Sequence, residues 1–148
     1  MLKKIDKVLA AFGNIRAMKR THVDTYTEGR INEIKGDQIA GNNLLGIWIT
    51  FNELAGYKFL ELAMLSRTEI KTFKGVELSF LGGEVEMYID SDTKEISSDY
   101  SNVSNRWLTH ISFEVSDEDI DFITKKEYEI VQIESKKKQI RFKTTNNS

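Results

Sequence analysis

Acidic side chains crowd the stretch from residue 111 to residue 126, which reads ISFEVSDEDIDFITKK. Four of them stand within five positions, and these are Asp117, Glu118, Asp119 and Asp121. The three aspartates occupy positions one, three and five of a calcium-binding loop of the EF-hand type. That loop also needs glycine at position six and glutamate at position twelve, where this chain has Phe122 and Tyr128. We therefore expect no metal at this cluster.

The same cluster has the composition of a helix start. Ser116 is a favoured N-cap residue, and Asp119 three positions later completes a capping box. Val115 and Ile120 have the spacing of a hydrophobic staple across the cap. Acids near the first turn and the two lysines at the far end match the two ends of the helix dipole. The cluster predicts a short helix that follows a strand.

A second group of carboxylates is spread over the DSDTKE stretch and the loop after it. Asp90, Asp92 and Asp99 belong to this group, and Glu95 stands where a calcium loop would need glycine. Paired carboxylates can perform acid–base chemistry, with or without a divalent ion. A carboxylate-based enzyme that uses these three aspartates is therefore one alternative function.

The two histidines, His22 and His110, are not spaced as metal ligands or as parts of a known catalytic motif. His110 alternates with Ile111 and Phe113, so we expect it on the exposed face of a strand. The glycine-rich signatures of nucleotide-binding loops and of nucleophile elbows are also missing. We expect a protein that is not an enzyme and that needs no cofactor or metal.

The polar loop SDYSNVSNRW, residues 98–107, has the composition of a binding loop. It contains Tyr100, Arg106 and Trp107, and these residue types are enriched at binding hot spots. Loops at the end of a sheet often carry function. We expect these three residues to contribute to a binding site. The alternative is that Trp107 begins the core face of the following strand.

Composition narrows the classes of partner. The 148 residues include no cysteine and no proline, and the formal net charge is −2. Residues 1–20 hold six basic residues and one acid, a charge of +5, so the remaining chain carries −7. An acidic body predicts no nucleic-acid partner. The absence of cysteine excludes disulfides, and no apolar run is long enough for a transmembrane segment. We expect a soluble, cytoplasmic protein with an unknown protein or small-molecule partner.

The basic segment 1–20 also has an amphipathic pattern. Its apolar residues recur at helical spacing, and they are Leu2, Ile5, Val8, Leu9, Phe12 and Ile15. We expect a helix there that packs on the protein's own sheet, with a partner helix or a membrane surface as alternatives. The segment that follows has poor periodicity, and we expect a short strand near 30–35 within it.

From residue 45 onward the apolar residues alternate as in β-strands. We expect strands over 57–65 and 107–115, and a final hairpin after the acidic helix. Val76, Leu78 and Phe80 alternate before Gly82-Gly83, and a second alternating run follows. This pattern predicts a hairpin with a two-residue turn, since glycine supplies the positive φ that such turns require.

These elements predict one domain over 1–148 with an antiparallel β core over 45–143. The expected fold is mainly β, a meander of about seven or eight strands arranged as a sandwich, a bent sheet or an open barrel. A helix precedes the core and a short helix precedes the last hairpin. The favoured function is a non-enzymatic binding or protein-interaction module. The apolar stretch 59–65 suggests a second alternative, a carrier that encloses a small apolar molecule.

Overall fold

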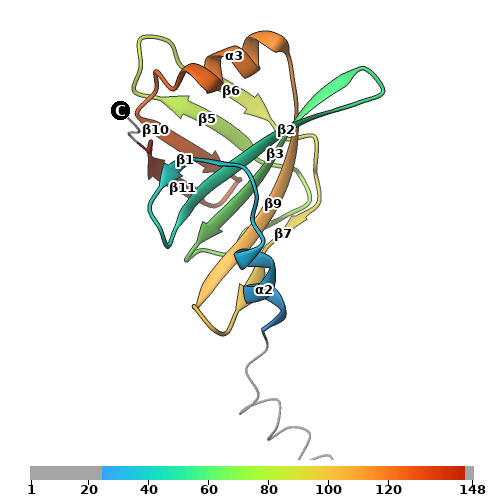
Figure 1. Cartoon of the computed structure of the whole chain (residues 1–148), viewed down its shortest axis with the longest axis vertical. Helices are drawn as coiled ribbons and strands as arrows, with labels where there is room; N and C mark the ends of the chain where they lie inside the picture. The colour runs from blue at the N-terminus through green and yellow to red at the C-terminus, as the bar shows by residue number, and fades with distance from the viewer. Residues whose placement is uncertain (1–24, 146–148) are drawn as a thin grey trace, which may run out of the picture.

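The computed structural model describes residues 25–145 and contains two helices and eleven strands within that range (Figure 1). The expected mainly β, antiparallel architecture is confirmed, and the strands do not close into a barrel. Short strands that sequence alternation does not reveal bring the number above the expected seven or eight. The helix expected within 1–20 and His22 lie outside the described residues. No helix of the described range is long and apolar enough to cross a bilayer.

The larger sheet has five antiparallel strands. In spatial order they are β1 (Asp37–Gly41), β2 (Gly46–Leu54), β3 (Tyr57–Ser66), β9 (Arg106–Val115) and β8 (Asp99–Ser101). The strands expected over 57–65 and 107–115 are confirmed as β3 and β9, which pair from Lys58 to Ser66. The sheets begin at Asp37, earlier than the expected start at residue 45. The sequence does not reveal β1, because it is a short edge strand without clear alternation.

Four more strands form a second sheet that packs against the first. In spatial order they are β11 (Gln139–Lys143), β10 (Ile130–Glu134), β5 (Glu77–Leu81) and β6 (Met87–Asp90). Two short strands, β4 (Lys71–Thr72) and β7 (Ile96–Ser97), pair separately. The two main sheets meet at both edges: an isolated bridge joins Ala40 to Thr144, and the Asp92 amide donates to the Ser112 carbonyl at 2.8 Å.

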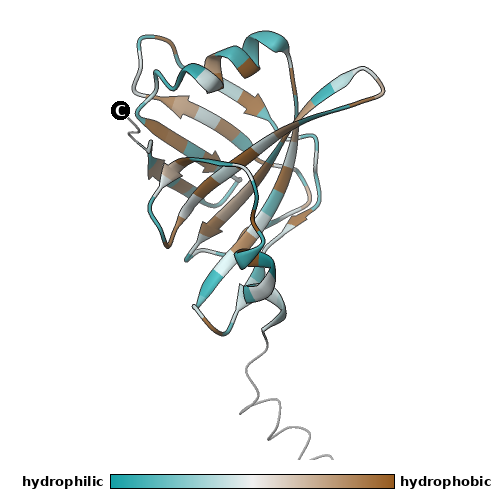
Figure 2. Ribbon diagram, in the orientation of Figure 1, coloured by the Kyte–Doolittle hydropathy of each residue, from teal (hydrophilic) through white to brown (hydrophobic). Residues whose placement is uncertain are grey.

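The main core lies between the two sheets. Its largest side chains include Leu60, Leu62 and Phe113 from the larger sheet and Leu78 and Phe80 from the smaller one, none more than 1% exposed. Figure 2 shows this pattern as apolar brown segments along the strands of both sheets. Burial of these side chains is the main favourable contribution to folding. It also makes the sheets a rigid support for the loops at their ends.

The first described helix, α2 (Tyr26–Asn32), replaces the strand expected near 30–35. The prediction was wrong because the segment is held by tertiary packing on the outer face of the larger sheet. Ile31 is 7% exposed and forms a small second core with Ala63, Leu65 and Leu108. With few apolar residues in the segment, its sequence lacks the periodicity that would reveal a helix.

The glycine-rich hairpin exists, but its turn is longer than expected. The last paired residues of β5 and β6 are Phe80 and Met87, so six residues lie between them. Leu81 continues β5 by pairing with Ile130 of β10, which takes Gly82 and Gly83 past the end of the β5–β6 ladder. The two-residue turn was therefore a wrong prediction, because it considered only one of the two neighbours of β5.

The acidic cluster begins the second helix, α3 (Asp117–Lys125). Ser116 accepts a hydrogen bond from the Asp119 amide at 3.1 Å, and the Asp119 carboxylate accepts one from the Ser116 amide at 2.9 Å. The predicted capping box is confirmed. The hairpin expected after this helix is confirmed as β10 and β11.

Candidate functional site

The structure brings Tyr100, Arg106 and Trp107 together at one end of the larger sheet. Tyr100 lies opposite Trp107, and Ser101 lies opposite Arg106, in the short ladder between β8 and β9. The turn between the strands closes with a hydrogen bond from the Asn105 amide to the Ser101 carbonyl at 2.9 Å. The polar loop of the sequence is therefore a tight hairpin, which fixes these side chains on a rigid strand pair. We call this hairpin, residues 99–107, the β8–β9 end.

The aromatic pair lies on the face of the β8–β9 end opposite α2. The ring centroids of Tyr100 and Trp107 are 4.8 Å apart, with their planes inclined by 53°. The Tyr100 hydroxyl donates to Asn105 Oδ1 at 2.7 Å, which fixes the ring. Tyr100 is 41% exposed, and Trp107 is half-buried. Cross-strand aromatic pairs stabilise a sheet, and here the pair also presents apolar surface to solvent.

Arg106 belongs to the opposite face and points toward α2. It is 8% exposed. Its guanidinium donates to Glu28 Oε2 at 3.2 Å, to the Leu44 carbonyl at 2.6 Å and to Ser104 Oγ at 2.8 Å. Arg106 therefore ties α2, the β1–β2 loop and the β8–β9 end together. Its donors are engaged within the protein, on the face opposite the aromatic pair.

Glu28 is the counterpart of Arg106, and sequence patterns did not single it out. Its carboxylate accepts hydrogen bonds from Ser101 Oγ at 2.6 Å and Ser104 Oγ at 2.7 Å. These two bonds, followed by the charge of Arg106, hold the pKa of Glu28 below its usual value. The carboxylate is thus ionised at neutral pH. No motif relates residue 28 to residues 101–106, so only the tertiary structure reveals the network.

The outer face of the larger sheet carries a groove of about 350 Å³ beside α2. Arg30 reaches across its end from α2, donating to Asp99 Oδ2 at 2.8 Å and to His110 Nδ1 at 3.0 Å. Trp48 and Glu61 from the neighbouring strands line the same groove. The groove therefore combines an aromatic side chain with both signs of charge.

The contact with Arg30 determines the chemistry of His110. A guanidinium can only donate, so Nδ1 must accept and the ring proton of the neutral imidazole is on Nε2. Partial burial, and next the charge of Arg30, lower the pKa of His110. His110 is exposed as expected, but its other ring nitrogen, Nε2, carries a hydrogen-bond donor at neutral pH. This arrangement suits the binding of an acceptor better than the removal of a proton.

A second polar pair continues the groove along the sheet. Ser112 lies opposite Glu61 in the β3–β9 ladder, and its hydroxyl donates to Glu61 Oε1 at 3.0 Å. Both residues also line an adjoining pocket of about 320 Å³ that includes Phe59. Sequence patterns identify the core face of these strands by its alternating apolar residues. They do not single out the outer face, because each of its residues is ordinary for the exposed side of a sheet.

The three aspartates of the alternative enzyme site do not share a cluster. Asp90 lies opposite Glu77 between β5 and β6, whereas Asp99 is bound to Arg30 at the far sheet. Asp92 is in the connection after β6. Among residues 25–145, no group of three or more histidines and acids is arranged to hold a metal ion.

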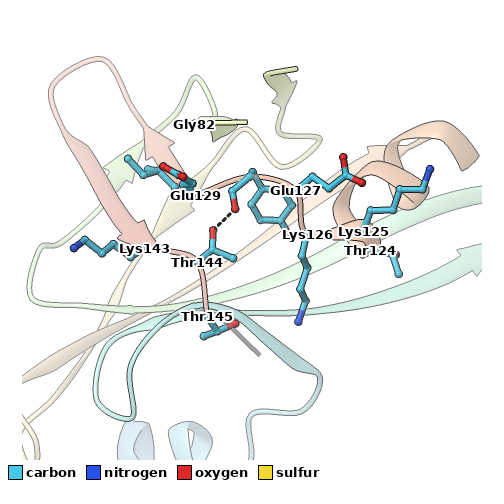
Figure 3. A pocket seen from close by; sticks show the side chains of 11 residues that line it. Gly82, Thr124, Lys125, Lys126, Glu127, Glu129, Lys143, Thr144 and Thr145 are labelled. Atoms are coloured by element: carbon cyan, nitrogen blue, oxygen red, sulfur yellow. Dashed lines mark hydrogen bonds between the residues drawn. The ribbon is translucent and has the colours of Figure 1, made fainter. Parts of the chain in front are cut away.

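A larger pocket, about 770 Å³, lies between the end of α3 and the outer end of the β10–β11 pair (Figure 3). Thr144 Oγ1 donates to the Tyr128 carbonyl at 2.9 Å within it. In Figure 3 the ammonium groups of Lys125, Lys126 and Lys143 point away from one another, so they do not converge on one ligand. Volume alone therefore does not make this pocket the best candidate.

The apolar stretch 59–65 is explained by burial on both faces of β3. Leu60, Leu62 and Met64 belong to the main core, while Ala63 and Leu65 pack under α2. Its unbroken apolar character thus does not require a ligand cavity. Comparisons of the chain with protein-family models, curated proteins and solved structures found no match, so function is argued from this geometry.

Proposed function

We propose that this protein is a non-enzymatic interaction module that binds a protein partner through the β8–β9 end. The observation that carries the proposal is the Tyr100–Trp107 pair, 4.8 Å between ring centroids and partly open to solvent. Tyrosine and tryptophan lose little conformational entropy on binding and bury a large apolar area. A pair already fixed by its neighbours loses still less.

The surroundings of the pair favour a protein over a small molecule. Neither ring lines the 770 Å³ pocket or the groove beside α2. β8 is the last strand of the larger sheet, so its outer edge is not paired within that sheet. An unpaired edge beside exposed aromatic rings suits an extended segment of another protein. The ion pair between Arg106 and Glu28 keeps this surface in one conformation.

The alternatives considered from the sequence have weaker support. A carboxylate enzyme would need Asp90, Asp92 and Asp99 to act together, and they are distributed over different elements. A carrier would need an apolar cavity, whereas the apolar residues of β3 are used in packing. His110 is held as a hydrogen-bond donor by Arg30. The proposal therefore assigns binding, and no reaction, to this part of the molecule.

The test compares proteins that co-purify with the wild type and with two variants, from cells that express the protein naturally. Tyr100→Ala removes the exposed half of the pair. Tyr88→Ala is the matched control, since Tyr88 is a tyrosine on β6, 55% exposed. We expect a partner enriched with the wild type and with Tyr88→Ala but reduced at least tenfold with Tyr100→Ala, as for a typical hot spot. Equal recovery with both variants would contradict the proposal.

A further inference from the structure

A separate surface is formed by two segments far apart in the sequence, β4 with the connection that follows it and the turn between β10 and β11. Together they line a shallow pocket of about 420 Å³. Five lysines and one aromatic residue dominate it, and we call this set the lysine platform: Lys71, Lys74, Lys136, Lys137, Lys138 and Phe73. No carboxylate lines the pocket. A concentrated positive surface on a chain of net charge −2 needs an explanation.

No carboxylate forms an ion pair with a platform lysine within the described part of the chain. Lys138 donates to the backbone carbonyl of Glu69 at 2.6 Å, which orients its ammonium without cancelling the charge. Lys74 lies close enough to Lys136 to lower the pKa of the Lys136 ammonium. Mutual repulsion of this kind is relieved when an anion binds.

Phe73 gives the platform a second property. The side chain is 70% exposed, although it lines the same pocket as the lysines and stands next to Lys74 in the sequence. An exposed phenylalanine ring contributes nothing to the core, and the contact of its apolar surface with water is unfavourable. Lysine-rich surfaces with an apolar side chain match the boundary between head groups and acyl chains of an anionic bilayer.

We propose that the lysine platform binds the surface of an anionic membrane, with the lysines on lipid head groups and Phe73 inserted below them. Charge complementarity selects an anionic surface, and the exposed ring selects a bilayer over a soluble polyanion. Single-stranded nucleic acid would favour several aromatic rings on which successive bases stack, and the platform has one. The inference concerns a different surface from the β8–β9 end and does not depend on the proposed protein partner.

The first test measures binding of the full chain to phosphatidylcholine vesicles with and without phosphatidylserine. We expect binding only to the anionic vesicles, and its loss when salt shortens the Debye length from about 10 Å to about 3 Å. Lys136→Gln with Lys137→Gln should weaken binding roughly 30-fold, from the typical contribution of two lysines near an anionic surface. Phe73→Ser should weaken it about tenfold.

Matched controls separate the platform from general charge. Lys35→Gln with Lys143→Gln removes two exposed lysines elsewhere, and Tyr88→Ser removes an aromatic residue that is 55% exposed. Both should bind the anionic vesicles as the wild type does. Because residues 1–20 are basic and remain in every variant, any binding through them is unchanged by the platform substitutions.

The second test reports insertion directly. The chain has no cysteine, so Phe73→Cys can be labelled at one position with an environment-sensitive fluorophore. Anionic vesicles should shift its emission to the blue, and the same label at Tyr88→Cys should not respond. The proposal is overturned if the emission of the label at position 73 does not shift with anionic vesicles. It is equally overturned if the platform variants bind these vesicles as tightly as the wild type. It is also overturned if an inositol polyphosphate or an oligonucleotide binds the platform while anionic vesicles do not.

Discussion

Arg106 is the residue on which the geometry of the β8–β9 end depends most. Its side chain in the pair with Glu28 is 10% exposed, and that of Glu28 is 16% exposed. Removing two charges from water is unfavourable, and the three hydrogen bonds from Arg106 offset this effect. The pair therefore contributes more to fixing one arrangement of α2, the β1–β2 loop and the β8–β9 end than to net stability.

Removal of one partner of the Arg106–Glu28 ion pair should destabilise the fold. We expect Arg106→Ala to lower the free energy of unfolding by about 2–3 kcal/mol, because Glu28 and the Leu44 carbonyl lose a charged donor. Arg67→Ala, at an exposed arginine, is the control and should change stability by less than about 0.5 kcal/mol. Urea unfolding measures both. If the two variants unfold alike, Arg106 does not have this role.

His110 should titrate below the usual histidine value of about 6.5. Its folded pKa is lowered, so the unfolded chain binds the proton more readily, and His110 stabilises the fold above pH 6.5. This contribution declines as the pH falls below 6.5 toward the folded pKa. NMR titration of the imidazole protons measures the pKa of His110 in the folded protein. Arg30→Gln should raise this pKa, because the neighbouring cation is removed. A titration of His110 that does not change in Arg30→Gln would contradict the contact.

Among the hairpins, the two-residue turn lies between β2 and β3, which are joined at a single glycine, and not at the Gly82-Gly83 pair. Leu54 pairs with Tyr57, so Ala55 and Gly56 form the two-residue turn, with φ of 54° and 85°. Positive φ at both positions is typical of a type I′ turn, for which Asn-Gly is the favoured sequence. Ala55 is thus held in a conformation that is unfavourable for a residue with a Cβ atom.

This strain predicts opposite effects at the two turn positions. Ala55→Asn should stabilise the protein by about 0.5–1 kcal/mol, since asparagine tolerates positive φ. Gly56→Ala should destabilise it by about 1 kcal/mol through backbone strain alone, because a Cβ atom there would meet no atom within 4 Å. Thermal and urea unfolding of both variants test the pair. Changes of the same sign would show that the turn is not of this type.

The cap of α3 provides a second prediction for an element. Ser116→Ala removes the acceptor for the Asp119 amide and should destabilise the fold by about 1 kcal/mol. Ser97→Ala, at an exposed serine of β7, is the comparison and should have an effect below about 0.5 kcal/mol. Equal urea midpoints for the two variants would mean that the capping box contributes nothing to stability.

For the whole molecule, the sequence predicts the antiparallel β class, the long strands and α3 because these depend on local patterns. Alternation places Ile111 and Phe113 inside, and Ser116 with Asp119 marks a helix start. Helix α2 is not predictable in this way, since it depends on the burial of Ile31 against β3 and β9. The β5–β6 turn fails for a similar reason, because β10 extends β5.

In the candidate site, too, local sequence predicts some features, whereas others depend on tertiary contacts. Residue type and loop position are sufficient to select Tyr100 and Trp107, which the structure places in contact. They are not sufficient to show that Arg106 turns inward, because its partner Glu28 is distant in the sequence. Likewise, the lysines of 71–74 and 136–138 are ordinary surface residues until the fold brings the two segments around one pocket.

Site-specific photo-crosslinking in cells that express the protein naturally tests directly whether the β8–β9 end contacts another protein. A photoreactive phenylalanine analogue replaces Tyr100 in one protein and Tyr88 in another, both exposed tyrosines on different sheets. If the β8–β9 end is the interaction surface, we expect a discrete crosslinked protein at position 100 that is missing at position 88 and is lost when Arg106→Ala disturbs the β8–β9 end. Crosslinks that are the same at both positions, or none at position 100, would contradict the assignment of the β8–β9 end as the interaction surface.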